Sequence, residues 1–596
     1  MRLPATRHSG DSWTWITRLA LAATAGYLLW LTACLIGKPA IPWDDHFISY
    51  IYSRNLATGH GLRYNATDAS PTEGFSSLTH VVLVAAGYRL GLDPLLTTRV
   101  LSLLFFLLVP ATLGLSLAGL LHVPASAALL LTCAAQLLLY LTPATPYHLL
   151  LGMETIIFMG SVAWLAGWSL REFGEDTGSA RAAAWRVVSG CGAATLVALG
   201  RPEGPLLVAL TLAVVYLARR FLLRDLRGRN DRAFSLVVGW TVIGLAIYLS
   251  WKQWYFGDIL PNPYYVKAHN AIMGTHISQF PGWRGVREFL GFAAPAFAAT
   301  AFLMLLARGQ TRIRSALLIA ALPGVCMVAL YARVIHEAAG SCRYEYPFLV
   351  FLALPLCGLA CLAISRIRAA PTVIALAAVG VLSLTPLPRN ALATSWTMFL
   401  AVRAGKPESG LVSIGKDLAW TGLGSRASIA VSAAGAIPYF SGFRAIDLLG
   451  LNDPFLSGRE PHSIAEVWEH VDSFRPDVLQ SALPPATPGF GIGQFDPVLD
   501  APCIKQMFSG NVGSELPQYW DQAKLLELVR REMLYIRDHY TFGAIYGAGD
   551  NRWTILYLRK DSPFREHIRG TLQRSSPSMN RHTDVSDWFR NDPRKL

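Results

Sequence analysis

Long apolar runs separated by short charged segments dominate residues 19–387. A run of about 20 apolar residues is long enough to cross a bilayer as a helix. The first run, 19–36, follows a basic segment and precedes no convincing cleavage site, so we interpret it as an uncleaved span whose N-terminus lies inside. The pattern predicts ten further spans, near residues 97–121, 124–142, 154–170, 186–200, 205–218, 234–254, 287–306, 315–334, 347–365 and 371–387.

The stretch 42–97 between the first two spans has a mixed character. Apolar residues recur there at helical spacing, at Phe47, Ile48, Ile51, Tyr52 and Leu56. The apolar stretch 78–90 is too short for a comfortable span, and counting it as one would place the later arginine-rich loops on the wrong side. We therefore predict two helices that lie on the membrane surface or enter it only partly.

Charge placement gives the orientation of these spans. The chain has 596 residues, of which 53% are hydrophobic and only 15% are charged, which is typical of a polytopic membrane protein. Its net charge of +13 comes largely from arginines in alternate loops, as the positive-inside rule predicts for cytoplasmic loops, and this pattern argues against nucleic-acid binding. These arginines are Arg171, Arg181, Arg186, Arg219, Arg220, Arg224, Arg227, Arg229, Arg232, Arg308, Arg312, Arg314, Arg366 and Arg368.

The region after residue 387 is less hydrophobic, and an odd number of spans places it outside. Short β-rich runs alternate with helical patterns, so we predict an extracytoplasmic α/β domain over 388–560 and a polar tail over 561–596. The expected strands are 411–414, 428–431, 445–448, 477–479 and 554–558, and a helix is expected over 522–537. Cys342 and Cys503 both fall in outer segments, which leaves a disulfide between them open.

The first outer segment carries adjacent carboxylates, Asp44 and Asp45, where a span has just ended. Neighbours on a helix point about 100° apart, so one would act and the other would orient or bind. The functional interpretation is a general base, or a site for a divalent cation, at the membrane face. The alternative is a solvated pair that stabilises a helix N-terminus. We expect Asp44 to act as the base, although the choice between the two is close to even.

The other outer segments hold further carboxylates, bases and aromatic residues. Arg201 and Glu203 interrupt an apolar run, so helix ends that can hold an anion would point into the same region. Such residues are either a charged rim with aromatic belt positions or a clamp for a lipid-linked phosphate. P-loop, GxSxG and CxxC patterns are absent from the sequence. The candidate substrate-binding residues are Glu73, Glu154, Arg201, Glu203, Asn262, Tyr264, Tyr265, Lys267, His269, His336, Arg343 and Tyr344.

Several motifs, taken in order, resemble those of the GT-C glycosyltransferases. Within that superfamily the chain is most similar to the AftB-type arabinofuranosyltransferases of actinobacterial cell walls. The resemblance covers almost the whole chain. The motifs are Asp44-Asp45-His46-Phe47-Ile48-Ser49-Tyr50, Thr72-Glu73-Gly74-Phe75, Gly152-Met153-Glu154-Thr155, Arg201-Pro202-Glu203-Gly204, Leu260-Pro261-Asn262-Pro263-Tyr264-Tyr265-Val266-Lys267 and Asp447-Leu448-Leu449-Gly450-Leu451-Asn452-Asp453.

The resemblance implies transfer of arabinofuranose from decaprenyl-phospho-arabinose to terminal arabinofuranosyl residues of arabinogalactan or lipoarabinomannan. The enzyme would lie in the plasma membrane with its active site on the periplasmic side. Asp44 would take the proton of the acceptor hydroxyl, Asp45 would orient the acceptor or a cation, and Lys267 with Arg201 or Arg343 would stabilise the leaving phosphate. No cofactor is required, and a divalent cation is an option. The alternatives are a GT-C transferase for mannose or aminoarabinose, a membrane transporter, and a non-catalytic glycan-binding relative.

Overall fold

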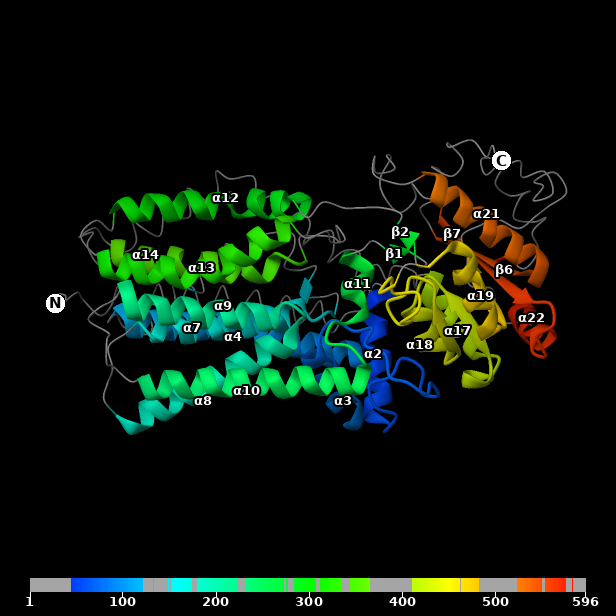
Figure 1. Cartoon of the computed structure of the whole chain (residues 1–596), viewed down its shortest axis with the longest axis horizontal. Helices are drawn as coiled ribbons and strands as arrows, with labels where there is room; N and C mark the ends of the chain where they lie inside the picture. The colour runs from blue at the N-terminus through cyan, green and yellow to red at the C-terminus, as the bar shows by residue number, and fades with distance from the viewer. Residues whose placement is uncertain are drawn as a thin grey trace.

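The computed structural model separates into a bundle of long helices and a sheet domain, with short helices between them (Figure 1). Five of the described helices are long and apolar enough to cross a membrane. The structure describes residues 44–121, 132, 148–149, 152–173, 179–222, 231–268, 271–272, 275–276, 283–306, 311–333, 343–364, 410–460, 462–481, 522–548, 552–574 and 581–582. The expected spans 19–36 and 371–387, most of 124–142, and both Cys342 and Cys503 lie outside these residues.

The long helices follow the apolar runs of the sequence closely. Pro202 lacks a backbone N–H, and α8 and α9 meet at this break in an otherwise continuous run. Each expected span in the described part corresponds to a helix. They are α4 (Pro94–Leu121), α7 (Thr155–Arg171), α8 (Ala180–Gly200), α9 (Gly204–Leu217) continuing into the π-helical turn η1 (Ala218–Leu222), α10 (Asp231–Phe256), α12 (Trp283–Leu306), α13 (Thr311–Arg333) and α14 (Leu349–Ile364), which follows the 3₁₀ turn η3 (Tyr346–Phe348).

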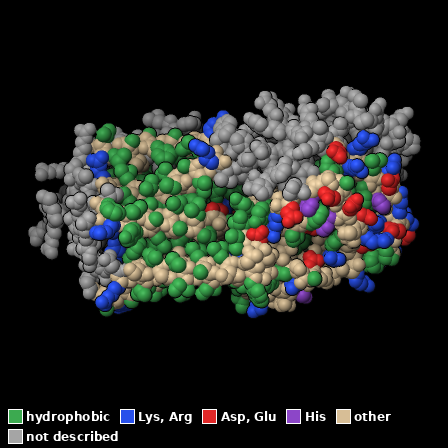
Figure 2. Space-filling model, viewed as in Figure 1, with side chains coloured by type: hydrophobic (Ala, Val, Ile, Leu, Met, Phe, Trp, Pro, Cys, Tyr) green, Lys and Arg blue, Asp and Glu red, His purple; other side chains and the backbone are tan. Residues whose placement is uncertain are grey.

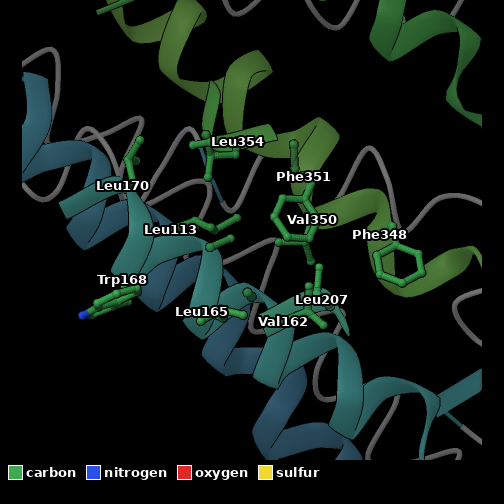
Figure 3. Packing of buried hydrophobic residues seen from close by; sticks show 14 of the residues in the cluster. Leu113, Val162, Leu165, Trp168, Leu170, Leu207, Phe348, Val350, Phe351 and Leu354 are labelled. Atoms are coloured by element: carbon green, nitrogen blue, oxygen red, sulfur yellow. The ribbon is translucent and has the colours of Figure 1, made fainter. Parts of the chain in front are cut away.

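The core of the bundle is formed by large apolar side chains from the middle of α4 and α7 and from the first turns of α9 and α14 (Figure 3). Leu113, Val162, Leu207 and Phe351 meet there, and each is almost completely buried. Burying such a side chain stabilises a fold by about 1.5–3 kcal/mol in water, but lipid is as apolar as leucine, so helix association here depends on close packing. The packed centre holds the polar helix ends in fixed positions.

The two predicted surface helices lie between the bundle and the sheet domain. They are α2 (Asp44–Ala57) and α3 (Leu78–Arg89), and α3 is capped by Ser77, whose hydroxyl accepts the N–H of His80. Both elements agree with the prediction of two helices in the first outer segment. Ile48, Ile51 and Tyr52 of α2 share an apolar cluster with strand residues of the C-terminal domain. The helix α2 therefore packs against the C-terminal domain as well as against α3.

The C-terminal domain is a mixed six-stranded sheet with strand order β4-β3-β5-β7-β6-β8. β3 pairs in parallel with β4 and β5, and the remaining pairs are antiparallel. The strands are β3 (Ser428–Val431), β4 (Arg444–Asp447), β5 (Val478–Ser481), β6 (Tyr540–Ala548), β7 (Arg552–Arg559) and β8 (Arg581–His582). The helices of this domain are α17 (Gly410–Ala419), the 3₁₀ turn η4 (Gly424–Arg426), α18 (Ala436–Ser441), α19 (Ile464–Phe474), α21 (Gln522–His539) and α22 (Arg565–Arg574).

These elements confirm the predicted α/β domain and correct it in two places. The run 411–414, expected as a strand, lies in α17, because Val412, Ile414 and Leu418 form one buried face at helical spacing. The region expected as a polar tail contains α22, which buries Ile568 and Leu572 against the domain core. The folded domain therefore continues past residue 560.

Two short elements complete the described part. α11 (Asn262–Ala268) follows the proline-rich segment after α10, and the hairpin β1 (Ala271–Ile272) and β2 (Thr275–His276) follows it. In Figure 1, α11 lies at the junction of the bundle and the sheet domain, close to α2 and α18. The motifs singled out in the sequence therefore come together at this junction.

Candidate functional site

The first residue of α2 binds the C-terminal domain directly. The carboxylate of Asp44 accepts the backbone N–H of Gly435 at 2.9 Å through Oδ2 and that of Ala436 at 2.6 Å through Oδ1. A carboxylate that accepts several backbone N–H groups is held in one orientation. Asp44 therefore fastens the start of α2 to the loop between β3 and α18.

The next residue points elsewhere and remains accessible. The side chain of Asp45 is 46% exposed, and its Oδ2 lies 3.7 Å from Nη1 of Arg343. The two carboxylates therefore have different surroundings, as expected for neighbours on a helix. Asp44 accepts backbone N–H groups, whereas Asp45 is accessible beside a guanidinium. This geometry favours Asp45, and not the expected Asp44, as the carboxylate that can reach a substrate.

Arg343 starts a chain of buried ion pairs that runs across the end of the bundle. Its Nη2 donates to Oε1 of Glu154 at 3.2 Å. Glu154 also lies 4.0 Å from Nε of Arg201, which contacts Glu203 at 3.2 Å, and Glu203 accepts the hydroxyl of Tyr331. Residues from the ends of α2, α7, α8, α9, α13 and α14 thus meet in one polar cluster, as the sequence predicts for Glu154, Arg201, Glu203 and Arg343.

Aromatic rings enclose this cluster. The guanidinium of Arg201 lies over Phe158 at 5.6 Å and over Tyr344 at 5.0 Å, and Arg343 lies 5.8 Å from the same Tyr344 ring. Such stacking holds a guanidinium in a fixed plane. The Nε of Arg343 is buried and has no hydrogen-bond acceptor within the described part of the chain.

Glu73 belongs to a different group of contacts from the one expected. We predicted that Glu73, Glu154 and Glu203 converge, but Glu73 instead pairs with Nζ of Lys252 at 2.9 Å, with both side chains 5% exposed. Burial raises the pKa of Glu73 to about 7, although Lys252 acts in the opposite direction. The backbone carbonyl of Glu73 accepts the N–H of Asn262, which joins this pair to α11.

Residues of the proline-rich segment form the outer border of this second group. The hydroxyl of Tyr265 donates to Asp258 at 2.9 Å, and Arg459 of the C-terminal domain pairs with Asp258 at 3.2 Å and donates to Oδ1 of Asn262. The neighbouring Tyr264 is 44% exposed. The segment 258–265, which carries predicted substrate-binding residues, is therefore bound to the C-terminal domain through Arg459.

The structure does not describe the side chains of three predicted substrate-binding residues. Lys267 lies in α11, but its side chain is outside the described part, and so are His269 and His336. Sequence reasoning missed Lys252, Tyr331 and Arg459, which complete the two groups. Lys252 carried a usable signal, because it is a lone lysine near the end of the apolar run 234–254.

The carboxylate pair does not fit a divalent cation. Hard cations prefer several oxygen ligands at one point, and the described residues contain no group of three or more His, Cys, Asp or Glu that could hold a metal ion. Both oxygens of Asp44 accept backbone N–H groups, and Asp45 lies beside the positive charge of Arg343.

Comparison with solved structures identifies the fold. The chain resembles ArnT from Cupriavidus metallidurans bound to undecaprenyl phosphate with a TM-score of 0.51 over 79% of this chain and 93% of that chain, at 16% identity. The chain has the GT-C fold. The apo structure of the same ArnT gives a TM-score of 0.49 at 15% identity over 77% of this chain and 93% of that chain.

Sequence comparison adds a match within the C-terminal domain. A family described as a domain of unknown function (DUF8728) matches residues 413–542. This range covers the segment from α17 to β6, including the loop that binds Asp44. No curated protein matches the chain. The GT-C fold therefore rests on the structural comparison.

Proposed function

We propose that this protein is a glycosyltransferase that uses a polyprenyl-phosphate-linked sugar at the junction between its helix bundle and its C-terminal domain. The observation that carries the proposal is Arg343, which contacts the accessible carboxylate of Asp45 and the buried carboxylate of Glu154 and keeps one buried donor, Nε, for a further acceptor. The fold shared with ArnT bound to undecaprenyl phosphate supports the same chemistry.

In the proposed reaction, Asp45 accepts the proton of the acceptor hydroxyl as that oxygen attacks the anomeric carbon of the donor. The bond between that carbon and the phosphate oxygen breaks, and the polyprenyl phosphate leaves with the bonding electrons. Arg343 stabilises the charge that develops on the phosphate. Burial raises the pKa of Asp44 to about 7, which would suit a base. A base must first lie within hydrogen-bond distance of the proton that it takes. Each oxygen of Asp44 already accepts a backbone N–H of the C-terminal domain, so Asp45 is the more accessible of the two.

The finer assignment follows the sequence resemblance. The donor would be decaprenyl-phospho-arabinose and the acceptor a terminal arabinofuranosyl residue of a cell-wall glycan, with Lys267 and Arg201 supporting the phosphate. The end of the bundle farthest from the sheet domain carries Lys and Arg side chains (Figure 2). Basic residues mark cytoplasmic ends, which supports an extracytoplasmic site and C-terminal domain in the plasma membrane.

The test is a transfer assay with purified protein in lipid nanodiscs. Three donors are offered in parallel, polyprenyl phosphates of arabinofuranose, mannose and aminoarabinose, with a short arabinofuranosyl acceptor. We expect transfer from the arabinofuranose donor and a loss of about 10²–10⁴-fold in Asp45→Asn. Glu469→Gln, an exposed carboxylate on the C-terminal domain, serves as the matched control. Transfer from none of the donors, or an Asp45→Asn variant as active as the control, would refute the proposal.

A further inference from the structure

Two groups of aromatic and polar side chains lie on α11 with the segment before it, and on the chain from the end of β4 into α19. One group is built around Phe455 and the other around Arg459. Both residues come from the loop after β4, where they are four positions apart. We call the two groups together the outer surface. It is formed by Asp258, Tyr264, Tyr265, Asp453, Phe455, Arg459, His462 and His470.

One half of the outer surface is a stack of three rings. Phe455 lies between His462, at a centroid distance of 3.7 Å and an angle of 11°, and His470, at 4.4 Å and 18°. Asp453 fixes the stack, because it lies 3.0 Å from Nε2 of His470 and accepts the backbone N–H of Phe455. All three rings are partly exposed, so their edges are accessible without any rearrangement.

The other half combines a guanidinium with two tyrosines. Arg459 lies 5.2 Å from the ring centre of Tyr265 and pairs with Asp258. Tyr264 packs edge-on against Tyr265 at 5.6 Å and is the most exposed ring of the group. Here too an aromatic face lies beside a carboxylate that is held in place.

The outer surface also connects inward to the segment that carries the buried Glu73–Lys252 pair. Arg459 donates to Asn262, whose side chain is fully buried and whose Nδ2 has no hydrogen-bond partner in the described part of the chain. Asn262 in turn donates its backbone N–H to Glu73. A buried amide with an unused donor costs stability unless a ligand accepts from it. This donor marks the inner end of the surface.

We propose that the outer surface binds the part of an oligosaccharide acceptor that does not react. A sugar ring presents C–H groups on its faces and hydroxyls around its edge, which matches rings interleaved with fixed carboxylates and a guanidinium. The mixed charges give no positive field for a polyphosphate chain, and a lipid chain would require aliphatic side chains. The proposal rests on the glycosyltransferase function and specifies its acceptor as a chain of several sugars.

The first test measures binding directly, so that it does not depend on turnover. The full chain in detergent is titrated with a linear α1,5-arabinofuranosyl hexasaccharide and, separately, with mannohexaose and a neutral decapeptide. We expect the arabinofuranosyl probe to bind and its Kd to rise about tenfold in Tyr264→Ala and in His462→Ala, since each removes one aromatic contact. Trp420→Ala, which removes a ring that is 77% exposed elsewhere on the domain, is the matched control.

Equal Kd values for all these variants, or binding of the decapeptide alone, would overturn the proposal. The second test compares acceptors of different length. We expect the ratio of kcat/KM for the hexasaccharide to that for the disaccharide to fall about tenfold in His462→Ala and to stay constant in Trp420→Ala. A protein that binds the hexasaccharide through these residues but transfers no sugar would uphold the binding surface and refute the proposed function.

Discussion

The carboxylate of Asp44 accepts the backbone N–H of Ala436 at 2.6 Å, across 392 positions of the chain. Together with the bond from Gly435 it holds the first outer segment against the C-terminal domain. The adjacent Asp45 is then held beside Arg343 by the position of α2. We therefore propose that Asp44 is a positioning residue.

Asp44→Ala should loosen the contact between α2 and the C-terminal domain. Two buried N–H groups lose their acceptor, and each costs about 1–3 kcal/mol when left unsatisfied. Hydrogen exchange of residues 435–441 should accelerate, and turnover should fall. Asp44→Asn keeps one acceptor oxygen and should retain part of the protection. If Asp44→Ala is inactive while exchange of this segment is unchanged, Asp44 is the catalytic base.

The pH dependence of stability should change in Asp44→Asn. Burial raises the pKa of Asp44 from 3.8 to about 7, the charge of Asp45 adds to this, and the two N–H donors oppose it. The folded protein therefore holds this proton more tightly than the unfolded chain, and the contribution of Asp44 to stability falls as pH rises from about 4 to about 7. Thermal unfolding should show wild type losing stability relative to Asp44→Asn across this window. A constant difference would contradict the raised pKa.

Gly435→Ala should disrupt the same contact from the other side. A Cβ atom at this position would lie 1.8 Å from the backbone oxygen of Asp44, so α2 or the β3–α18 loop must move. Turnover should fall strongly without loss of the sheet, as measured by circular dichroism and the transfer assay. Gly410→Ala is the control, because a Cβ there meets nothing within 4 Å. Equal activity of the two variants would show that the close approach is unimportant.

Glu154→Gln and Glu172→Gln form a matched pair. Each carboxylate lies between two arginines, Glu154 at the junction with Arg343 and Arg201, and Glu172 with Arg186 and Arg219 where α7, α8 and η1 meet. Both variants should destabilise the protein, because each removes a buried carboxylate that two arginines share. Glu172→Gln should cost more stability, since Arg201 and Arg343 keep Glu203 and Asp45 as partners in Glu154→Gln.

Only Glu154→Gln should also raise the KM for the lipid donor, because Glu154 binds Arg343, which lies beside Asp45. Kinetics at a temperature where both variants remain folded would show this difference. A similar rise in KM for Glu172→Gln would mean that the effect follows from lost stability and not from the site.

The helices were predictable because spans and surface helices differ in length and in the charges that flank them. The run 78–90 was predicted as a short helix and not as a span, and α3 is a helix of 12 residues. Four-residue apolar runs carry less information, since a strand and one turn of an amphipathic helix look alike, and 411–414 was assigned wrongly for this reason.

The grouping of charged residues was harder to predict than their location. Sequence placed Glu73 and Glu154 on one face, but their partners depend on how helices rotate against each other. Lys252 pairs with Glu73 only because the end of α10 lies beside the first outer segment. The bond between Asp44 and the β3–α18 loop has no local signal at all, since it joins residues nearly 400 positions apart.

The hydroxyl of Tyr52 donates to Asn452, which is 400 residues later in the chain, and the apolar cluster of α2 is completed by strands of the C-terminal domain. Ribosomes add about 5–20 residues per second, so about 20–80 s pass between synthesis of α2 and synthesis of its partners. During this time Tyr52 has only the nearby partners of its own segment, such as Tyr64 and Phe75. The face of α2 that packs against the strands stays uncovered by them until the C-terminal domain has been synthesised, so the junction is completed late in synthesis.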